Sequence, residues 1–230
     1  MAEPDRRSIV RVSLADQVTE SLRHMILTGE FRSGQHLTHD ELAKRLGVST
    51  MPVREALLRL SHEGFVDMEP NRAFRVTPMT RSDIEDIYWA HATLAGELTA
   101  RACRQDRTEL LTELEEIQSA WLASGTTARP EQLEVLNYRF HRAINRASAS
   151  PRIIRLLSST VRLIPEHFYA LVPEWRGVST TGHVAIIEAI RDRAPERARK
   201  AASAHVLEAG SLLVEHFTDT GFWAEPKAPH

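Results

Sequence analysis

The spacing of apolar residues divides the chain into two regions. Between Thr38 and Thr77 the pattern predicts two short helices and then two short strands. From about Thr80 to Gly221 only the helical spacing of three and four residues recurs, and no strand pattern competes with it. The chain is therefore expected to hold two structurally different parts.

In the first region, the residue types at helix ends define a helix, a turn and a second helix. Thr38 and Glu41 stand three apart, as in a capping box that starts a helix, and Gly47 can end that helix in the left-handed conformation. Ser49 suits the N-cap of the next helix, which Gly64 closes. The buried stripe of this second helix is expected to consist of Val53, Ala56, Leu57 and Leu60.

A pair of short strands, residues 65–69 and 74–77, is expected to follow and to complete a winged helix-turn-helix. Thr50 and Arg54 lie four residues apart, outside the buried stripe and near the N-terminus of the second helix. In a recognition helix this end meets base edges in the major groove. The arrangement therefore predicts duplex DNA as the partner, although three-helix modules of this shape also occur without contacting DNA.

The second region is predicted to be a bundle of helices. Thr80 and Asp83 cap the first of them, and prolines 130, 151 and 195 can each open a later one. We predict a mainly α protein: an N-terminal winged helix-turn-helix and a C-terminal all-helical bundle of six or seven helices. Its expected parts are a DNA-binding domain of residues 1–78, a bundle of residues 79–221 and a tail of residues 222–230.

Bulk composition fits two modest domains, and charge modifies the picture only slightly. No apolar run reaches membrane-spanning length and the N-terminus lacks a signal-peptide core, so a cytoplasmic protein is expected. The formal net charge of -2 argues weakly against a DNA partner. We therefore expect the positive side chains to concentrate on one face, including Arg6, Arg7, Arg54 and Arg72.

Three histidines of the bundle are predicted to converge. His183 and His205 stand at equal distances from the short turn around Ala194, which places them at the same height in an antiparallel hairpin. Asn137 and His141, four residues apart, share one face of the third helix. Three neutral imidazoles and one oxygen donor could bind a transition metal. The alternative is that each histidine is exposed or hydrogen-bonded where it stands.

Residues Ser13 to Thr77 resemble the winged helix domain of the GntR family of bacterial transcription regulators. The resemblance rests on the runs L-A-D-Q-V-T-E-S-L-R-H-M-I-L, G-V-S-T-M-P-V-R-E-A-L-L-R-L and E-G-F-V. It implies that Arg54 reads a base, and that the wing tip also contacts DNA. The implied DNA-contacting set is Ser49, Thr50, Met51, Arg54, Asn71 and Arg72.

The bundle is similar to the ligand-binding domain of the FadR-type (FCD) branch of that family. The similar words are N-Y-R-F-H, G-H-V-A-I-I-E-A-I and A-A-S-A-H-V. The resemblance implies a divalent metal, zinc foremost and nickel or manganese otherwise, and a small organic acid as effector. The implied metal ligands are Asn137, His141, His183 and His205. Where the family often has arginine, this chain has His91; His91 and Arg162 are expected to contact the effector, although Arg162 could also be an ordinary surface residue.

These observations together predict a homodimeric bacterial regulator that binds a double-stranded operator and is no enzyme. We expect a repressor whose operator binding is modulated by a small carboxylate in a metal-containing helical pocket, with no membrane partner. A metal-dependent hydrolase that uses the three histidines is the competing hypothesis. Against it, Glu188 lies five residues past His183, on another face of that helix. A metal-storing or purely structural dimer is a third possibility.

Overall fold

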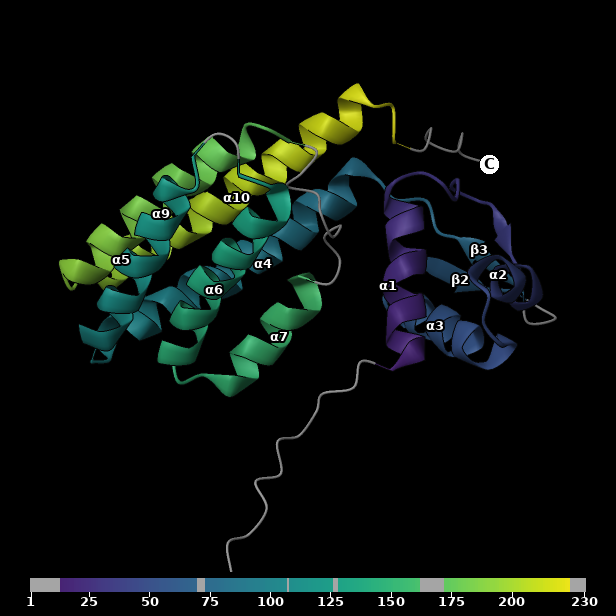
Figure 1. Cartoon of the computed structure of the whole chain (residues 1–230), viewed down its shortest axis with the longest axis horizontal. Helices are drawn as coiled ribbons and strands as arrows, with labels where there is room; N and C mark the ends of the chain where they lie inside the picture. The colour runs from purple at the N-terminus through teal and green to yellow at the C-terminus, as the bar shows by residue number, and fades with distance from the viewer. Residues whose placement is uncertain (1–12, 70–72, 107, 126–127, 162–171, 224–230) are drawn as a thin grey trace, which may run out of the picture. The chain divides into compact units, whose positions relative to one another are not determined.

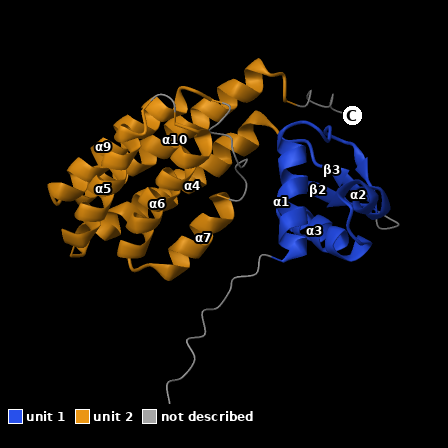
Figure 2. Cartoon of the chain, viewed as in Figure 1, with its two compact units in different colours: residues 1–79 blue, residues 80–230 orange. Residues whose placement is uncertain are grey.

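The computed structural model describes residues 13–69, 73–106, 108–125, 128–161 and 172–223. The chain separates into two compact units, residues 1–79 and 80–230 (Figure 2). Several residues singled out from the sequence lie outside the described residues and receive no structural account. They are Arg6, Arg7, Asn71, Arg72 and Arg162, together with residues 224–230 of the tail.

The first unit is a three-helix module with a small sheet (Figure 1). Its helices are α1 (Leu14–Leu27), α2 (His39–Leu46) and α3 (Thr50–His62), and its strands are β1 (His36–Leu37), β2 (Val66–Met68) and β3 (Phe74–Val76). The strands are antiparallel in the order β1-β3-β2. The wing hairpin is present with shorter strands than predicted. Strand β1 was not predicted, because two residues are too few for a periodic signal.

The turn between α2 and α3 has the predicted chemistry, with one exception. The Thr38 hydroxyl accepts from the Glu41 amide at 3.4 Å, and Gly47 ends α2 with a φ of 67°. Gly64 follows α3 with a φ of 81°. Ser49 occupies the N-cap position of α3, but its side chain makes no capping hydrogen bond. The start of α3 is therefore set by the turn geometry and by Pro52 in its first turn.

Helix α1 is held against α3 by apolar packing and by one buried ionic network. Leu22 of α1 and Leu57 of α3 are completely buried. Arg23 is also buried; it donates to Glu20 and, at 2.6 Å, to Glu63 at the end of α3. These two acceptors raise the pKa of Arg23 against the opposing and larger effect of burial. Because a buried guanidinium needs its partners, this network fixes where α3 lies on α1.

The second unit is all-helical in the part of the chain that the structure describes, which confirms the mainly α fold class. Its helices are α4 (Arg81–Arg104), α5 (Thr108–Ala123), α6 (Pro130–Ala147), α7 (Pro151–Val161), α9 (Trp175–Arg191) and α10 (Pro195–Asp219). Prolines open α6, α7 and α10 as predicted, and Thr80 and Asp83 form a complete capping box at α4. None of the helices in the described residues combines the length and the apolarity needed to cross a membrane.

Helices α4 and α10 form the longest contact of the bundle and lie side by side in Figure 1. Glycine permits their close approach at two levels. A side chain at Gly96 would meet the Ser203 hydroxyl at 2.3 Å, and one at Gly210 would meet the Tyr88 ring at 2.5 Å. Helix α9 packs on α10 and on α5, and its Ile186 and Ile190 are completely buried. Val184, predicted from spacing to join this stripe, is 39% exposed, so that prediction was wrong.

Candidate functional site

Helix α3 presents a polar face and buries the opposite one. Val53, Ala56 and Leu57 are fully buried, whereas Thr50 and Arg54 are exposed. Met51, between them in the first turn, is 71% exposed although it is apolar. The side chain of Arg54 has neither an ion pair nor a hydrogen bond to any other described residue. The first turn of α3 is therefore available to a partner outside the described part of the chain.

Most other arginines of this unit are neutralised internally. Arg23, Arg45, Arg59 and Arg75 each contact at least one carboxylate; for Arg75 the partner is Glu69 at 2.5 Å. Among the described residues, Arg32, Lys44 and Arg54 lack such a partner. This difference explains how a unit with no basic excess can still present positive charge at α3, since pairing removes the other cations from consideration.

The histidine cluster of the second unit is formed by His141, His183 and His205 from helices α6, α9 and α10. One ring nitrogen from each can be chosen so that all three lie within 4.8 Å of one another. The Nε2 atoms of His205 and His141 are 3.2 Å apart. The Asn137 side-chain oxygen lies 3.2 Å from His183 Nε2. The four side chains that the sequence brought together by level and face therefore do meet in the structure.

The hairpin of α9 and α10 explains why two of the histidines coincide. Residues 192–194 separate the two helices, and Pro195 opens α10. His183 and His205 stand eleven residues on either side of Ala194, and their ring centroids are 5.1 Å apart. His141 reaches the same level from α6, with its centroid 5.1 Å from that of His205 and 5.4 Å from that of His183.

Aromatic and buried surroundings keep the cluster neutral. The ring of Phe140 stacks on His183 with centroids 3.8 Å apart, and Trp121 meets the same imidazole edge-on at 5.5 Å. Burial lowers the pKa of His205 to about 4, and lowers the pKa values of His141 and His183 well below their ordinary value. Neutral imidazole is the form that ligates metals.

The donor set fits a divalent transition metal. Zinc–nitrogen bonds are about 2.0–2.1 Å long, so two imidazole nitrogens bound to one ion at roughly 100° stand about 3.2 Å apart. The observed separation of His141 Nε2 from His205 Nε2 is 3.2 Å. In the described residues, Nδ1 of His183 and Nδ1 of His205 are buried without a hydrogen-bond partner. The orientation of these rings therefore depends on packing rather than on a second layer of hydrogen bonds.

Several residues around the cluster could not have been found from the sequence. At Gly182, an added Cβ would stand 2.5 Å from His205 Nδ1, so the histidine lies directly over this glycine. A glycine inside a helical pattern is the only sequence signal for such a contact. Gln118 is buried, and neither atom of its amide has a partner among the described residues. The contacts Glu113–Arg146 and Trp121–Thr180 give the helix registers that put Gln118 near the level of His141 and His183.

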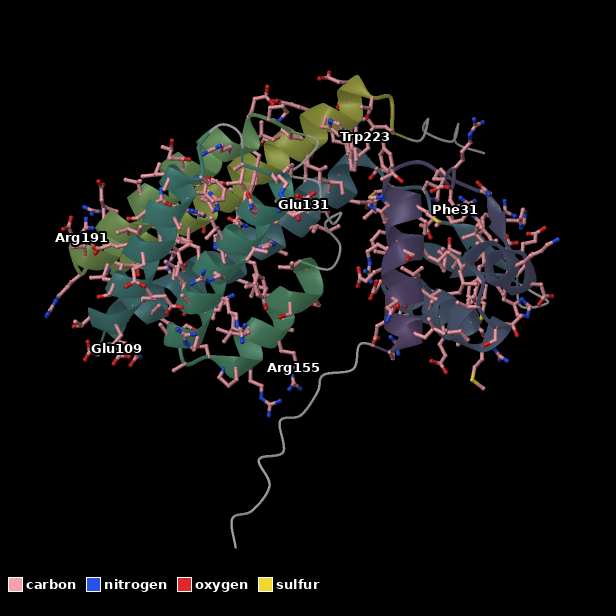
Figure 3. The ribbon with its side chains drawn as sticks, in the orientation of Figure 1. Phe31, Glu109, Glu131, Arg155, Arg191 and Trp223 are labelled. Carbon is pink, nitrogen blue, oxygen red and sulfur yellow. The ribbon has the colours of Figure 1, made fainter. Side chains whose placement is uncertain are left out.

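The effector residues expected from the sequence are only partly described. His91 of α4 is half-buried, burial lowers its pKa to about 4, and the nearby charge of His205 lowers it further. Arg162 lies outside the described residues. Arg155 and Arg191 are exposed and project away from the helices (Figure 3). Neither of these two arginines therefore contributes charge to the histidine cluster.

A small winged unit with an exposed, unpaired arginine on its second helix, followed by a helical bundle, defines a DNA-binding transcriptional regulator. The chain belongs to the GntR family. Residues 14–76 match the family of bacterial regulatory proteins named gntR, and residues 86–208 match the FCD domain.

Relatives along most of the chain are of the same kind. An uncharacterized HTH-type transcriptional regulator of Mycobacterium tuberculosis is 30% identical, over 88% of this chain and 82% of its own. The HTH-type transcriptional regulator McbR of Escherichia coli is 29% identical over 72% of this chain and 76% of its own. The solved structure of McbR covers 90% of this chain and 99% of its own, with a TM-score of 0.67 and 25% identity. Because the family and these relatives are regulators and not enzymes, the hydrolase hypothesis is not supported.

Proposed function

We propose that two copies of this chain bind a near-palindromic operator, each placing the first turn of α3 in the major groove. In this arrangement Arg54 reads a guanine, while Ser49, Thr50 and Met51 contact the adjoining bases and backbone. Asn71 and Arg72 are proposed to reach the DNA from the wing. Two-fold pairing places the half-sites about one helical turn apart. The proposed setting is the bacterial cytoplasm, where operator DNA is found.

The observation that carries this proposal is the state of Arg54. Four other arginines of the same unit are paired with carboxylates, whereas Arg54 is exposed on a helix whose other face is buried. A guanidinium that served stability would have a partner in its own chain. An exposed methionine beside it, at 71%, adds an apolar surface of the kind that contacts a thymine methyl.

We further propose that the bundle holds a divalent metal on Asn137, His141, His183 and His205, and that a small organic acid binds there. A bound metal ion supplies positive charge and open coordination positions for oxygen donors. The protein residues fix the position of those donors, and Phe140 and Trp121 exclude water from the His183 side. Zinc fits the nitrogen-rich donor set best, with nickel and manganese as alternatives.

Effector binding alters operator affinity only if the effector prefers one arrangement of the two domains over the other. We propose that it favours the arrangement that releases DNA, so that the regulator is a repressor. A relative supports this sign: a protein of Enterobacter named HTH-type transcriptional repressor NanR is 26% identical over 87% of this chain.

The DNA assignment is tested by selecting operator sequences from a genomic library with the full chain and then measuring binding by Arg54→Ala. Loss of the base contact should weaken binding to the selected operator by about 1–3 kcal/mol, relative to random DNA. Arg81→Ala is the matched control, because Arg81 is also an exposed helix arginine, paired with Glu85 on α4. Equal binding by wild type and Arg54→Ala would refute the proposed recognition mode.

A further inference from the structure

The donor set of the histidine cluster carries no charge. His141, His183 and His205 coordinate as neutral imidazoles, and Asn137 offers an amide oxygen. Among the described residues, no aspartate or glutamate belongs to the cluster. A divalent ion held by these side chains would therefore keep its full double charge.

The surroundings make such a charge costly. His183 is 1% exposed and His205 is 4% exposed, and the aromatic ring of Phe140 stacks directly on His183. A buried charge without a counter-charge is strongly unfavourable in a medium of this kind. Glu134, one turn before Asn137 on α6, is half-buried and engaged in an interaction of its own, and it is not one of the cluster's donors.

We propose that the metal and a small organic dianion bind to this chain as one unit, the dianion supplying the charge that Asn137 does not. The inference deepens the proposed function, on which it rests, by assigning the effector class: a dicarboxylate whose oxygens complete the coordination of the metal. The metal is then a co-effector that is retained in the presence of the acid, and not a permanently bound structural ion. By linkage, the acid raises the affinity for the metal by the same factor as the metal raises the affinity for the acid.

The test uses the full chain after removal of metal by a chelator. Co²⁺ binding is followed by visible absorption, with free Co²⁺ fixed by a metal buffer, in chloride, acetate or malonate at one ionic strength. We expect malonate to raise the affinity for Co²⁺ well above the value in acetate. Asn137→Asp places one negative charge in the cluster, so it should bind Co²⁺ at least about tenfold more tightly without acid, and gain less from malonate.

Asn145→Asp is the matched control, because Asn145 lies on the same helix two turns further on and outside the cluster; it should behave as wild type. Equal Co²⁺ affinity of the wild type in chloride, acetate and malonate overturns the inference, and this comparison needs no variant to fold. Tight Co²⁺ binding that Asn137→Asp leaves unchanged overturns it as well. Absence of any Co²⁺ absorption in folded wild type would instead remove the metal site of the proposed function, whereas the operator test with Arg54→Ala would be unaffected.

Discussion

Gly182 offers the sharpest test of how the histidine cluster is held. In Gly182→Ala, the new methyl group would stand 2.5 Å from His205 Nδ1, 2.8 Å from its Cγ and 2.9 Å from its Cβ. Ordinary contacts begin near 3.4 Å, so the imidazole or the whole of α10 must move by about 1 Å. Metal coordination tolerates only about 0.2 Å in each bond length. We therefore expect Gly182→Ala to lose most of its affinity for Co²⁺.

Stability should change by less than metal binding does. Overpacking costs about 1–3 kcal/mol, and the higher helix propensity of alanine offsets about 1 kcal/mol of this. The matched control is Gly177→Ala on the same helix, where an added Cβ meets nothing within 4 Å; it should bind Co²⁺ as wild type does. The assays are Co²⁺ titration by visible absorption and urea unfolding. Wild-type Co²⁺ affinity in a folded Gly182→Ala protein would refute the assignment of His205 as a ligand.

Further predictions concern stability. Glu63→Gln deprives the buried Arg23 of one partner and should lower the free energy of unfolding by about 2 kcal/mol or more, whereas Glu85→Gln breaks only an exposed pair and should change it by less than about 1 kcal/mol; urea denaturation of both variants compares them. Because the pKa values of His91 and His205 are lowered to about 4 in the folded chain, the unfolded chain binds protons there below about pH 6.5 and the folded chain does not. Without metal, the free energy of unfolding should therefore fall as the pH is lowered from 6.5 to 5, by about 1.4 kcal/mol per pH unit for each such histidine; a flat profile would contradict this reading.

The helical frame could be predicted from the sequence because local signals decide it. Gly47, with a positive φ, and the capping box of Thr80 end and start helices without help from distant residues. The level of His183 and His205 followed from counting residues on either side of one turn, because a helix rises by a constant amount per residue. Short loops make such counting safe, and residues 192–194 form a short loop.

Contacts between distant segments could not be predicted in this way. The pairing of Arg23 with Glu63 joins α1 to the end of α3, and the approach of His205 to Gly182 depends on the exact spacing of two helices. Val184 shows the same limit from the other side. Its spacing fits the apolar stripe of α9, yet it lies outside the helix face that its neighbours cover. Periodicity gives the face of a helix only to within one residue on either edge.

The three histidines come from helices that are well separated along the chain, and this has a consequence for the bundle as a whole. An ion bound to α6, α9 and α10 would act as a removable cross-link, closing two long loops in the same way that disulfides do. Its affinity for the native state adds directly to the resistance of the bundle to unfolding. The availability of metal in the cell would then set the lifetime of the regulator against proteolysis.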